Sequence, residues 1–551
     1  MKKPATIIIA SVLSCLAISC EKSVLDKNPQ NEFSEKDVWG DINLAKTYLN
    51  TVYDGIGQWG MHHYRNPQVM ANSATDEAMQ RGDHGVWVLN KGNITSSNYG
   101  DFNMWTPDYK AIRRCNIFLQ HIGDVPGISE EDLKLMKAQA RFIRAINYAD
   151  LLNWYCWWEG DHNGVPLITE PFELNDDFKV ERADYSAVVD FVIKELDEIL
   201  DDLPAGWDDQ NWGRVTKGAD LALKSEILLY AASKTHNPAM DPSKWKQAAD
   251  AARAVIDLDQ YSLKSVNSYE DYAKIFISSA NNPEIILARP YDPVVLESNW
   301  VDLYNLPNGY GGWGGNCPTQ QFVDQFQMDN GRDISDPSSG YDDQRPYTGR
   351  ELRFYADIVY NGRKYRGREV EFWTPGGLDS KDGPTGWNVT PTGYTLYKFM
   401  NESIDFQVSP APTPYVIFRL AEIYLNYAEA EYHLGNEEVA REFVNKIRTR
   451  VKLPGIRSSG NRLLQDIRHE RTIELAFEKD SRWNDLRRWG ILEQTASQDY
   501  IAMQISKDHE GNLSYQKVVA MKRGYNERLY SLPIPLEELQ KASELNQNPG
   551  Y

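Results

Sequence analysis

The chain has 551 residues, of which 41% are hydrophobic and 25% charged, as in an ordinary globular protein. Its 79 acidic and 59 basic residues give a formal charge of −20, and so acidic a body repels phosphate backbones, which argues against a nucleic-acid partner. Downstream of Cys20 only Cys115, Cys156 and Cys317 remain, which allows one disulfide and excludes a disulfide scaffold.

The first residues have the pattern of an export signal. Two lysines precede an apolar stretch over residues 5–17, which is too short to span a bilayer. Residues 16–20, with the sequence LAISC, then follow the order of a lipobox, in which a cysteine is lipidated before cleavage. We therefore expect removal of residues 1–19 and lipid on Cys20; a lipobox ending at Cys15 and an ordinary signal peptide are the alternatives. No later segment is apolar for long enough to cross a membrane, so we expect a lipid-anchored protein.

Beyond a short tether over residues 20–34, several segments are predicted to form amphipathic helices. Over 138–152, small and large apolar residues recur every three or four positions and so share one helical face. A Leu- and Ala-rich segment over 219–233 predicts a second helix, and a third is expected over 245–256.

The clearest helical unit lies near the C-terminus. Apolar residues at helical spacing predict one helix over 417–428 and another over 440–451. Between them, Gly435 marks a left-handed helix cap, and Pro454 ends the second helix. This order is typical of a tetratricopeptide hairpin. We therefore predict an α-helix-dominated fold built on tetratricopeptide-like hairpins, with long irregular loops and minor β content.

Long connections rich in Gly, Pro, Asn, Trp and Tyr separate the predicted helices, over 56–106, 290–320 and 336–415. Loops of that length in a compact protein are usually functional, so we interpret the helices as scaffold and the loops as the working surface. Trp105 falls at helical spacing and is expected in the core, together with Tyr109. For the aromatic cluster over 154–158 we favour the core over a binding role.

Many segments, taken in chain order, resemble the SusD/RagB family. The most specific are ERTIELAFE at 470–478 and DLRRWG at 485–490. The others are 20–29, 33–39, 140–145, 164–167, 213–219, 419–422, 429–430, 445–448, 532–535 and 547–551. Their joint order over nearly the full length carries the resemblance. One departure is that the family's usual Arg-Asp-Pro-Arg stands here as Arg350-Glu351-Leu352-Arg353.

The resemblance implies a place on the outer-membrane surface, where the chain would cap a SusC-like TonB-dependent transporter and bind a glycan for it. It divides the chain into a signal peptide (1–19), a lipidated N-terminus and tether (20–34), an N-terminal region (35–270) and a C-terminal region (271–551), the last two packed as one globular unit. Peptide or other nutrient capture is the alternative within the family.

Glycan binding requires exposed aromatic rings with polar groups at their edges, and two loops offer that mixture. In the family, a Thr-Asp-Glu followed closely by tryptophans forms part of the binding platform, which matches Thr75-Asp76-Glu77 here. The candidate ligand-binding residues on this first loop are Asp76, Arg81, His84 and Trp87. Those on the second loop are Trp300, Tyr304, Asn305, Tyr310 and Trp313. The alternative is that these rings pack the loops against the helices.

Three carboxylates, Glu470, Glu474 and Glu478, share one helix face and raise the possibility of an exported glycoside hydrolase. Five arginines at 468, 471, 482, 487 and 488 favour an ion-paired scaffold instead, so we expect a binding protein and not an enzyme. A purely structural surface lipoprotein is a third alternative. No cofactor is expected, although Asp329, Asp333 and Asp336 faintly resemble a calcium loop.

Overall fold

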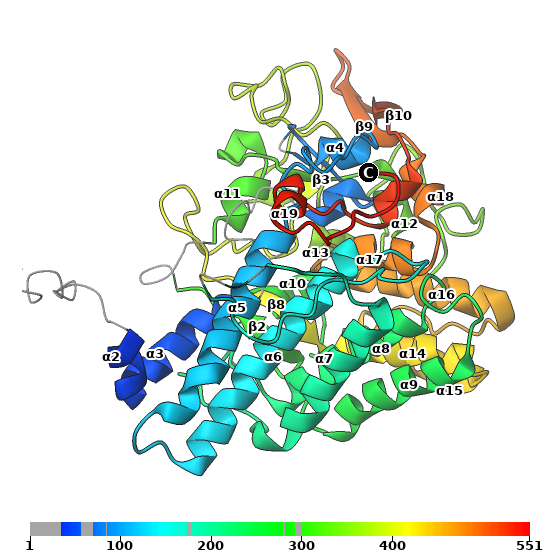
Figure 1. Cartoon of the computed structure of the whole chain (residues 1–551). Helices are drawn as coiled ribbons and strands as arrows, with labels where there is room; N and C mark the ends of the chain where they lie inside the picture. Colours follow the sequence, from blue (N-terminus) through cyan, green and yellow to red (C-terminus); the bar gives the residue numbers. More distant parts are fainter. Residues whose placement is uncertain are drawn as a thin grey trace, which may run out of the picture.

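A computed structural model gives the fold and describes residues 35–56, 70–83, 85–173, 176, 178–278, 281–292 and 299–551. Cys20 and His84 lie outside these residues, so what the sequence predicts for them stays a prediction. Helix dominates over strand (Figure 1), which confirms the predicted fold class. Within the described ranges, no helix is both long and apolar enough to span a bilayer.

Helices that pack side by side, all but the first of them long, form the lower part of the molecule in Figure 1. They are α2 (Glu35–Gly40), α3 (Ile42–Tyr53), α5 (Trp105–His121), α6 (Glu130–Tyr155), α7 (Tyr185–Ile199), α8 (Lys217–Ala232), α9 (Pro242–Asp257), α14 (Leu420–His433) and α15 (Glu437–Arg450). α8 pairs with α9, α14 pairs with α15, and α14 also packs on α9. The helical-hairpin scaffold expected from the periodicity is therefore confirmed.

Local capping groups set the helix boundaries. Ser129 Oγ accepts a hydrogen bond from the Asp132 amide (3.0 Å) at the start of α6, and Thr216 Oγ1 accepts one from the Ala219 amide (3.2 Å) at the start of α8. Gly435 follows α14 with a φ of 85°, in the left-handed region that favours glycine. The chain thus turns into α15 where the sequence predicts it.

The start of the predicted helix over 417–428 is wrong. Residues up to Arg419 belong to strand β8 (Tyr415–Arg419), and α14 begins only at Leu420. β8 pairs antiparallel with β2 (Ile285–Arg289). The β-branched and aromatic side chains of this segment favour a strand once such a partner is present, so the helical spacing of Ile417 is coincidental.

Long loops joined by short elements form the rest of the molecule, most of it toward the top of Figure 1. The helices of this part are α4 (Trp87–Asn90), α10 (Tyr269–Ile277), α11 (Val301–Asn305), α12 (Gln320–Gln325), α13 (Leu352–Asp357), α16 (Gly460–Glu474), α17 (Ser481–Arg488), α18 (Leu492–Ala496) and α19 (Leu536–Lys541), all short except α16. The strands are β1 (Ala78–Gln80), β3 (Asn316–Pro318), β4 (Ile358–Val359), β5 (Lys364–Tyr365), β6 (Arg368–Glu369), β7 (Thr395–Leu396), β9 (Tyr500–Lys507) and β10 (Leu513–Met521). Each sheet has two strands, paired β1–β3, β2–β8, β4–β7, β5–β6 and β9–β10.

Two large hydrophobic cores hold these parts together. The first lies among the long helices and includes Trp105 and Trp154, which are 4% and 1% exposed, in agreement with the prediction for both positions. The second lies beneath the loops and includes Phe322, Phe354 and Leu396.

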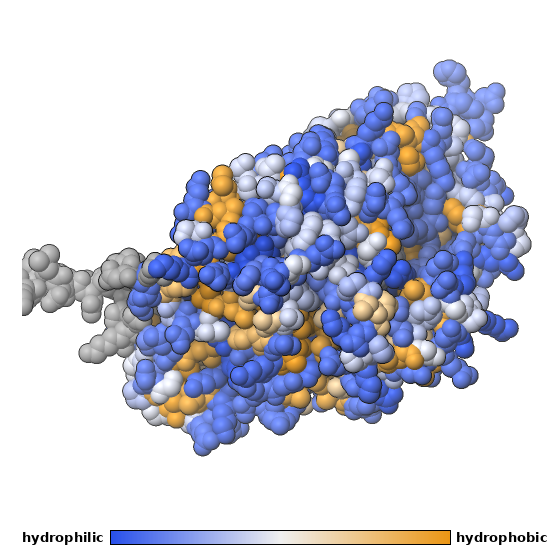
Figure 2. Space-filling view, turned by 45° about the vertical axis from the view of Figure 1, so that its right-hand side comes forward, coloured by the Kyte–Doolittle hydropathy of each residue, from blue (hydrophilic) through white to orange (hydrophobic). Residues whose placement is uncertain are grey.

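The surface is mainly polar. Hydrophilic residues cover most of the face seen in Figure 2, and hydrophobic residues form small scattered groups on it. Cys115, Cys156 and Cys317 are buried and free, so none of the three forms a disulfide.

Candidate functional site

The two loops that carry the candidate binding residues converge. β1 and β3 pair antiparallel, with Gln80 opposite Asn316. The next residue, Arg81, donates from its amide to the Gly315 carbonyl (2.9 Å) and from Nε to the Trp313 carbonyl (2.8 Å). A pairing between segments more than two hundred positions apart thus brings the loops to one surface.

Two aromatic rings of the second loop form a pair at this surface. The rings of Tyr304 and Trp313 lie 5.1 Å apart at 63°, and both side chains are half-buried. The Trp313 amide donates to the Leu303 carbonyl (2.7 Å), and the Gly315 amide donates to the Tyr304 carbonyl (2.6 Å). The backbone of the loop therefore holds both rings in position before any ligand arrives.

Trp87 lies at the other side of the first loop, where it opens α4. Its Nε1 donates to the Gln80 carbonyl at 3.2 Å, and the Lys91 ammonium lies 4.8 Å from its ring. The side chain is half-buried and packs against the edge of the first core. Its indole therefore already has partners on two sides.

The most exposed aromatic side chain beside this surface belongs to Trp387, which is not among the residues predicted from the sequence. Trp387 is 62% exposed. Its neighbour Asn388 has a carbonyl oxygen that would lie only 2.9 Å from a Cβ added at Gly314, so the two backbones touch where Gly314 follows Trp313. The sequence feature that could have identified Trp387 is its place after Gly386 in a loop that is expected to be functional.

Asp76 supports the loops instead of facing solvent. Its two carboxylate oxygens accept from Nε (2.8 Å) and Nη2 (2.7 Å) of Arg482 in α17. Burial alone would raise the pKa of Asp76, but the Arg482 guanidinium holds it below its ordinary value. Because this carboxylate is largely buried and already paired, we withdraw Asp76 from the predicted ligand contacts.

Asn305 is also a support residue. It is fully buried, and its Oδ1 accepts from the amide (3.0 Å) and Nδ2 (2.8 Å) of Asn316, which fixes β3 against α11. We withdraw it from the ligand contacts for the same reason as Asp76.

Tyr310 and Trp300 complete the predicted second wall. The Tyr310 hydroxyl donates to the Tyr365 carbonyl (3.1 Å), and the Arg368 guanidinium lies 3.7 Å from its ring. Burial raises the pKa of Tyr310 to about 12. Trp300 precedes α11 and is half-buried. Tyr310 is thus held on both its hydroxyl and its ring, which makes it a support residue.

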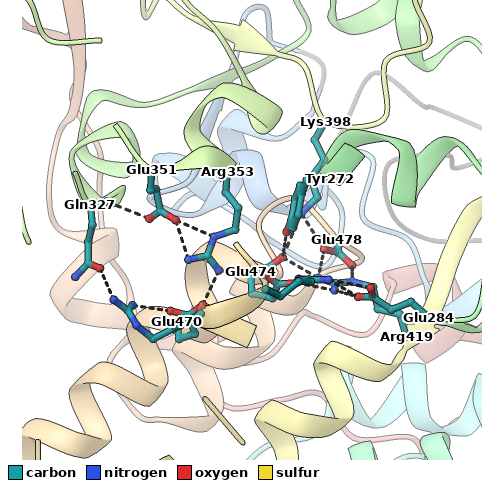
Figure 3. Close-up of polar contacts among 12 residues, drawn as sticks. Tyr272, Glu284, Gln327, Glu351, Arg353, Lys398, Arg419, Glu470, Glu474 and Glu478 are labelled. Carbon is teal, nitrogen blue, oxygen red and sulfur yellow. Dashed lines mark hydrogen bonds and ion pairs between the residues drawn. The ribbon is translucent and has the colours of Figure 1, made fainter. Parts of the chain in front are cut away.

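The three carboxylates predicted on one helix face are buried inside an ion-pair network (Figure 3). Only Glu470 and Glu474 belong to α16, which ends at Glu474; Glu478 lies in the turn beyond it, so the prediction that all three share one helix face is wrong. Glu474 pairs with Arg353 (3.0 Å), Arg419 (2.7 Å) and Arg450. The remaining pairs are Glu470 with Arg353 (2.6 Å) and Arg448 (2.9 Å), and Glu478 with Arg419 (2.6 Å) and Lys398 (2.8 Å). All three side chains are enclosed and saturated with cations, which is the geometry of a scaffold.

The cations of this network differ from the ones the sequence suggests. The arginines that follow α16 in the chain serve other acids, with Arg482 on Asp76 and Arg488 on Glu429 (2.7 Å). Helical spacing reveals only neighbours on the same helix, whereas Arg353 and Arg419 arrive from distant segments. In the segment 350–353, where the sequence departs from the family's Arg-Asp-Pro-Arg, Glu351 takes the place of the aspartate. Its carboxylate accepts a hydrogen bond from Arg353 Nε at 2.9 Å.

The faint calcium loop has no cluster of ligands. Asp336 accepts from Arg332 Nη1 (2.7 Å), and Asp333 accepts from Gln327 Nε2 (2.9 Å). Within the ranges that the structure covers, no group of three or more His, Cys, Asp or Glu side chains is placed to hold a metal ion.

The surface formed by Arg81, Tyr304, Trp313 and Trp387, here called the ring surface, offers aromatic faces beside a fixed guanidinium. Nε of Arg81 is used to hold the loop, and its Nη1 and Nη2 have no hydrogen-bond partner among the residues described. Rings beside such donors suit a flat ligand rimmed by hydroxyl groups.

Comparisons with known proteins identify the family of the chain. A family model described as the SusD family matches residues 275–551, and one described as starch-binding and associating with the outer membrane matches residues 24–229. A SusD-like protein of Formosa agariphila is 25% identical over 96% of this chain and 95% of its own length.

Solved structures show the same fold. A SusD-like protein from Bacteroides fragilis NCTC 9343 has a TM-score of 0.78 and 29% identity, covering 95% of this chain and 100% of that one. A laminarin-binding SusD-like protein has a TM-score of 0.68 and 24% identity, covering 93% of this chain and 100% of that one. Because the SusD family model matches just over half of the chain, this protein belongs to the SusD/RagB family.

Proposed function

We propose that this protein binds an oligosaccharide or polysaccharide at the ring surface and delivers it to a SusC-like TonB-dependent transporter. The observation that carries the proposal is Trp387, 62% exposed beside the Tyr304–Trp313 pair. Tryptophan is highly buried on average, so an indole left open where three loops meet is explained by ligand contact. Sugar rings present flat C–H faces that stack on such side chains.

Neutral glucans are the first ligand class to consider. The matched family model is described as starch-binding, and one relative of similar fold is described as laminarin-binding. Of the four residues that define the ring surface, Arg81 is a cation and none is an acid. Stacking and hydroxyl contacts would therefore dominate over charge recognition.

Binding proceeds without turnover in this proposal. A glycosidase needs two carboxyl groups on either side of a bound sugar, and the ring surface has none. The three acids predicted to align, Glu470, Glu474 and Glu478, are sealed among cations in the interior. We therefore propose a carrier and not a hydrolase.

The proposed setting is the outer leaflet of the outer membrane, with lipid on Cys20 as the anchor. Loss of the signal peptide removes two lysines and no acid, which takes the formal charge from −20 to −22. The tether over 20–34 would let the folded body reach a transporter beside it.

Trp387→Ala and Trp313→Ala test the proposal directly. Purified wild type and variants are run in gels that contain soluble starch or laminarin, and the retardation gives relative affinity. Each aromatic contact contributes about 0.5–1.5 kcal/mol beyond burial, so each single change should weaken binding about 2- to 13-fold. The glycan recovered after incubation should be intact.

Trp158→Ala is the matched control, because the ring of this half-buried tryptophan contacts Trp157 (3.7 Å) and Tyr530 (4.8 Å), neither of which belongs to the ring surface. It should leave retardation unchanged. Trp387→Ala should also leave the melting temperature unchanged, since its side chain is open to solvent. Full affinity in both ring-surface variants would place the site elsewhere, and binding of peptides instead of glycans would favour the alternative cargo.

A further inference from the structure

A cavity of about 500 Å³, separate from the ring surface, lies at the start of α8, beside β2. It shares no lining residue with the ring surface, and Figure 1 places β2 and α8 below β3 and α4. Three aromatic residues, Trp207, Trp212 and Tyr261, contribute to its walls. Its size falls within the range of small-ligand sites.

Hydrogen bonds at their polar edges hold two of these rings in place. Trp207 Nε1 donates to the Val215 carbonyl at 2.9 Å, just before α8. The Tyr261 hydroxyl bonds the Thr216 side chain at the cap of the same helix. Both rings are half-buried, so the helix start fixes their edges while part of each ring meets the cavity. A ligand would pay little ordering entropy for rings that are already fixed.

The turn between the two tryptophans is also fixed. Asp208 Oδ1 accepts from the amide (3.0 Å) and Nδ2 (2.9 Å) of Asn211, and Asn211 Oδ1 accepts from Arg214 Nε (3.1 Å). These bonds close the turn and bring Trp207 and Trp212, five positions apart, to one cavity. The arrangement is built before any ligand binds.

The polar side chains that line the cavity are neutral, with one arginine as the exception. Gln260 and Asn281 line it with exposed amides that form no hydrogen bond with any residue the structure describes. The only charged lining residue is Arg214, whose guanidinium also donates to Gln139 Oε1 (3.3 Å) and Asn50 Oδ1 (2.7 Å). Apart from this guanidinium, the described lining of the cavity offers ring faces and neutral amides and no carboxylate.

We infer that this cavity, here called the α8 site, is a second and separate binding site for neutral oligosaccharides. Indole faces would stack on hexopyranose C–H faces, while the amides of Gln260 and Asn281 would exchange hydrogen bonds with neighbouring hydroxyls. A second site on the same protein would let one polysaccharide chain bind at two points, which raises the avidity of a weak contact.

The test uses the full mature chain carrying Trp313→Ala and Trp387→Ala, so that the ring surface is disabled. Maltoheptaose and laminariheptaose, each at about 10 mM, are examined by saturation-transfer-difference NMR, which detects millimolar binding. The double variant should still show transfer to at least one of these glucans. Adding Trp207→Ala and Trp212→Ala should reduce it at least fivefold, whereas adding Trp158→Ala should leave it unchanged.

Gln260→Ala with Asn281→Ala provides a second route that avoids the packed rings. Both side chains are exposed, so this variant should fold normally and still lose most of the transfer. Absence of transfer in the ring-surface variant, or transfer that survives loss of both tryptophans and of both amides, would overturn the inference. Failure of the proposed function shows separately, as unchanged starch and laminarin retardation in the ring-surface variant.

Discussion

Glu474→Gln probes the buried network that joins the loops to the C-terminal helices. Glu474 is fully buried and faces Arg353 and Arg419 (Figure 3). Arg450 also lies within ion-pair distance of it. Glutamine has nearly the same shape, so the change removes charge with little change in packing. The cations then lose one shared counter-charge in an interior where replacement by water is not possible.

Removing one partner of a buried ion pair costs about 3–5 kcal/mol. Here each cation keeps another carboxylate, such as Glu284 for Arg450 (2.8 Å) and Glu470 for Arg353 (2.6 Å). We therefore expect the lower end, about 3 kcal/mol. The unfolding entropy of about 2.1 cal/mol/K per residue, summed over a chain of this length, is about 1 kcal/mol per degree, so Tm should fall by about 3 °C.

The effect should depend on pH with a definite sign. Burial alone would raise the pKa of Glu474, but Arg450, Arg419 and Arg353 hold it well below its ordinary value. A depressed pKa gives stability that is present above the unfolded value, about 4.3, and is lost as pH falls through the folded value. The Tm difference between wild type and variant should thus be full at pH 7 and shrink below about pH 4.

Calorimetry on both proteins measures this difference, and Glu442→Gln is the control. Glu442 pairs with Lys446 (2.9 Å) on an exposed face of α15, where such pairs contribute at most about 1 kcal/mol. Its loss should lower Tm by less than about 1 °C. The double change Glu474→Gln with Arg450→Met should cost less than the sum of its parts, because the unpaired cation is gone. Equal Tm for Glu474→Gln and Glu442→Gln would refute the reasoning.

Two further predictions concern the anchor and a lone buried acid. Cys20→Ala should move the protein from the membrane fraction to the soluble fraction, and intact mass of the wild type should show diacylglycerol on Cys20; a variant that stays in the membrane would contradict the lipobox. Burial raises the pKa of Asp357 to about 7, with Lys398 and Arg353 offsetting only part of the effect, and neither carboxylate oxygen has a hydrogen-bond partner among the described residues. The folded state therefore keeps a proton that the unfolded state releases near pH 3.9, about the ordinary value, so stability falls as pH rises toward 7. Asp357→Asn, which mimics the protonated acid, should match wild type in Tm near pH 3 and exceed it by a margin that grows up to about pH 7, and equal values at pH 3 and pH 7 would contradict the shift.

The helical part of this fold could be predicted because its signals are local. Apolar spacing, a cap at Thr216 and a glycine at Gly435 all lie within a few positions of the helix they define. Strand β8 could not be predicted in the same way. Its residue Ile417 fits the period of the following helix by chance, and only pairing with β2, far upstream, makes the segment a strand.

The candidate site shows the same difference between local features, which the sequence predicts, and long-range contacts, which it does not. The composition of the two loops marks them as functional candidates, but their convergence at Arg81 and Trp313 follows only from the structure. Trp387 was missed because one tryptophan in a long loop has no periodic neighbours to mark it. The acids of α16 were correctly read as scaffold, but the cations that hold them come from segments such as Arg419 that no helical spacing connects to them.

Several polar residues that the sequence suggests as ligand contacts serve as supports for the loops. A long loop has few backbone ladders, so its carbonyls and amides need side-chain partners, and polar residues beside a ring are recruited for that purpose. Asp76 binds Arg482, and Asn305 binds Asn316, each across a long stretch of sequence. Composition therefore identifies a candidate binding loop but cannot distinguish its support residues from residues that contact a ligand. That distinction depends on which side chains stay exposed to solvent once the support residues have formed their hydrogen bonds. At this surface the most exposed aromatic side chain is Trp387.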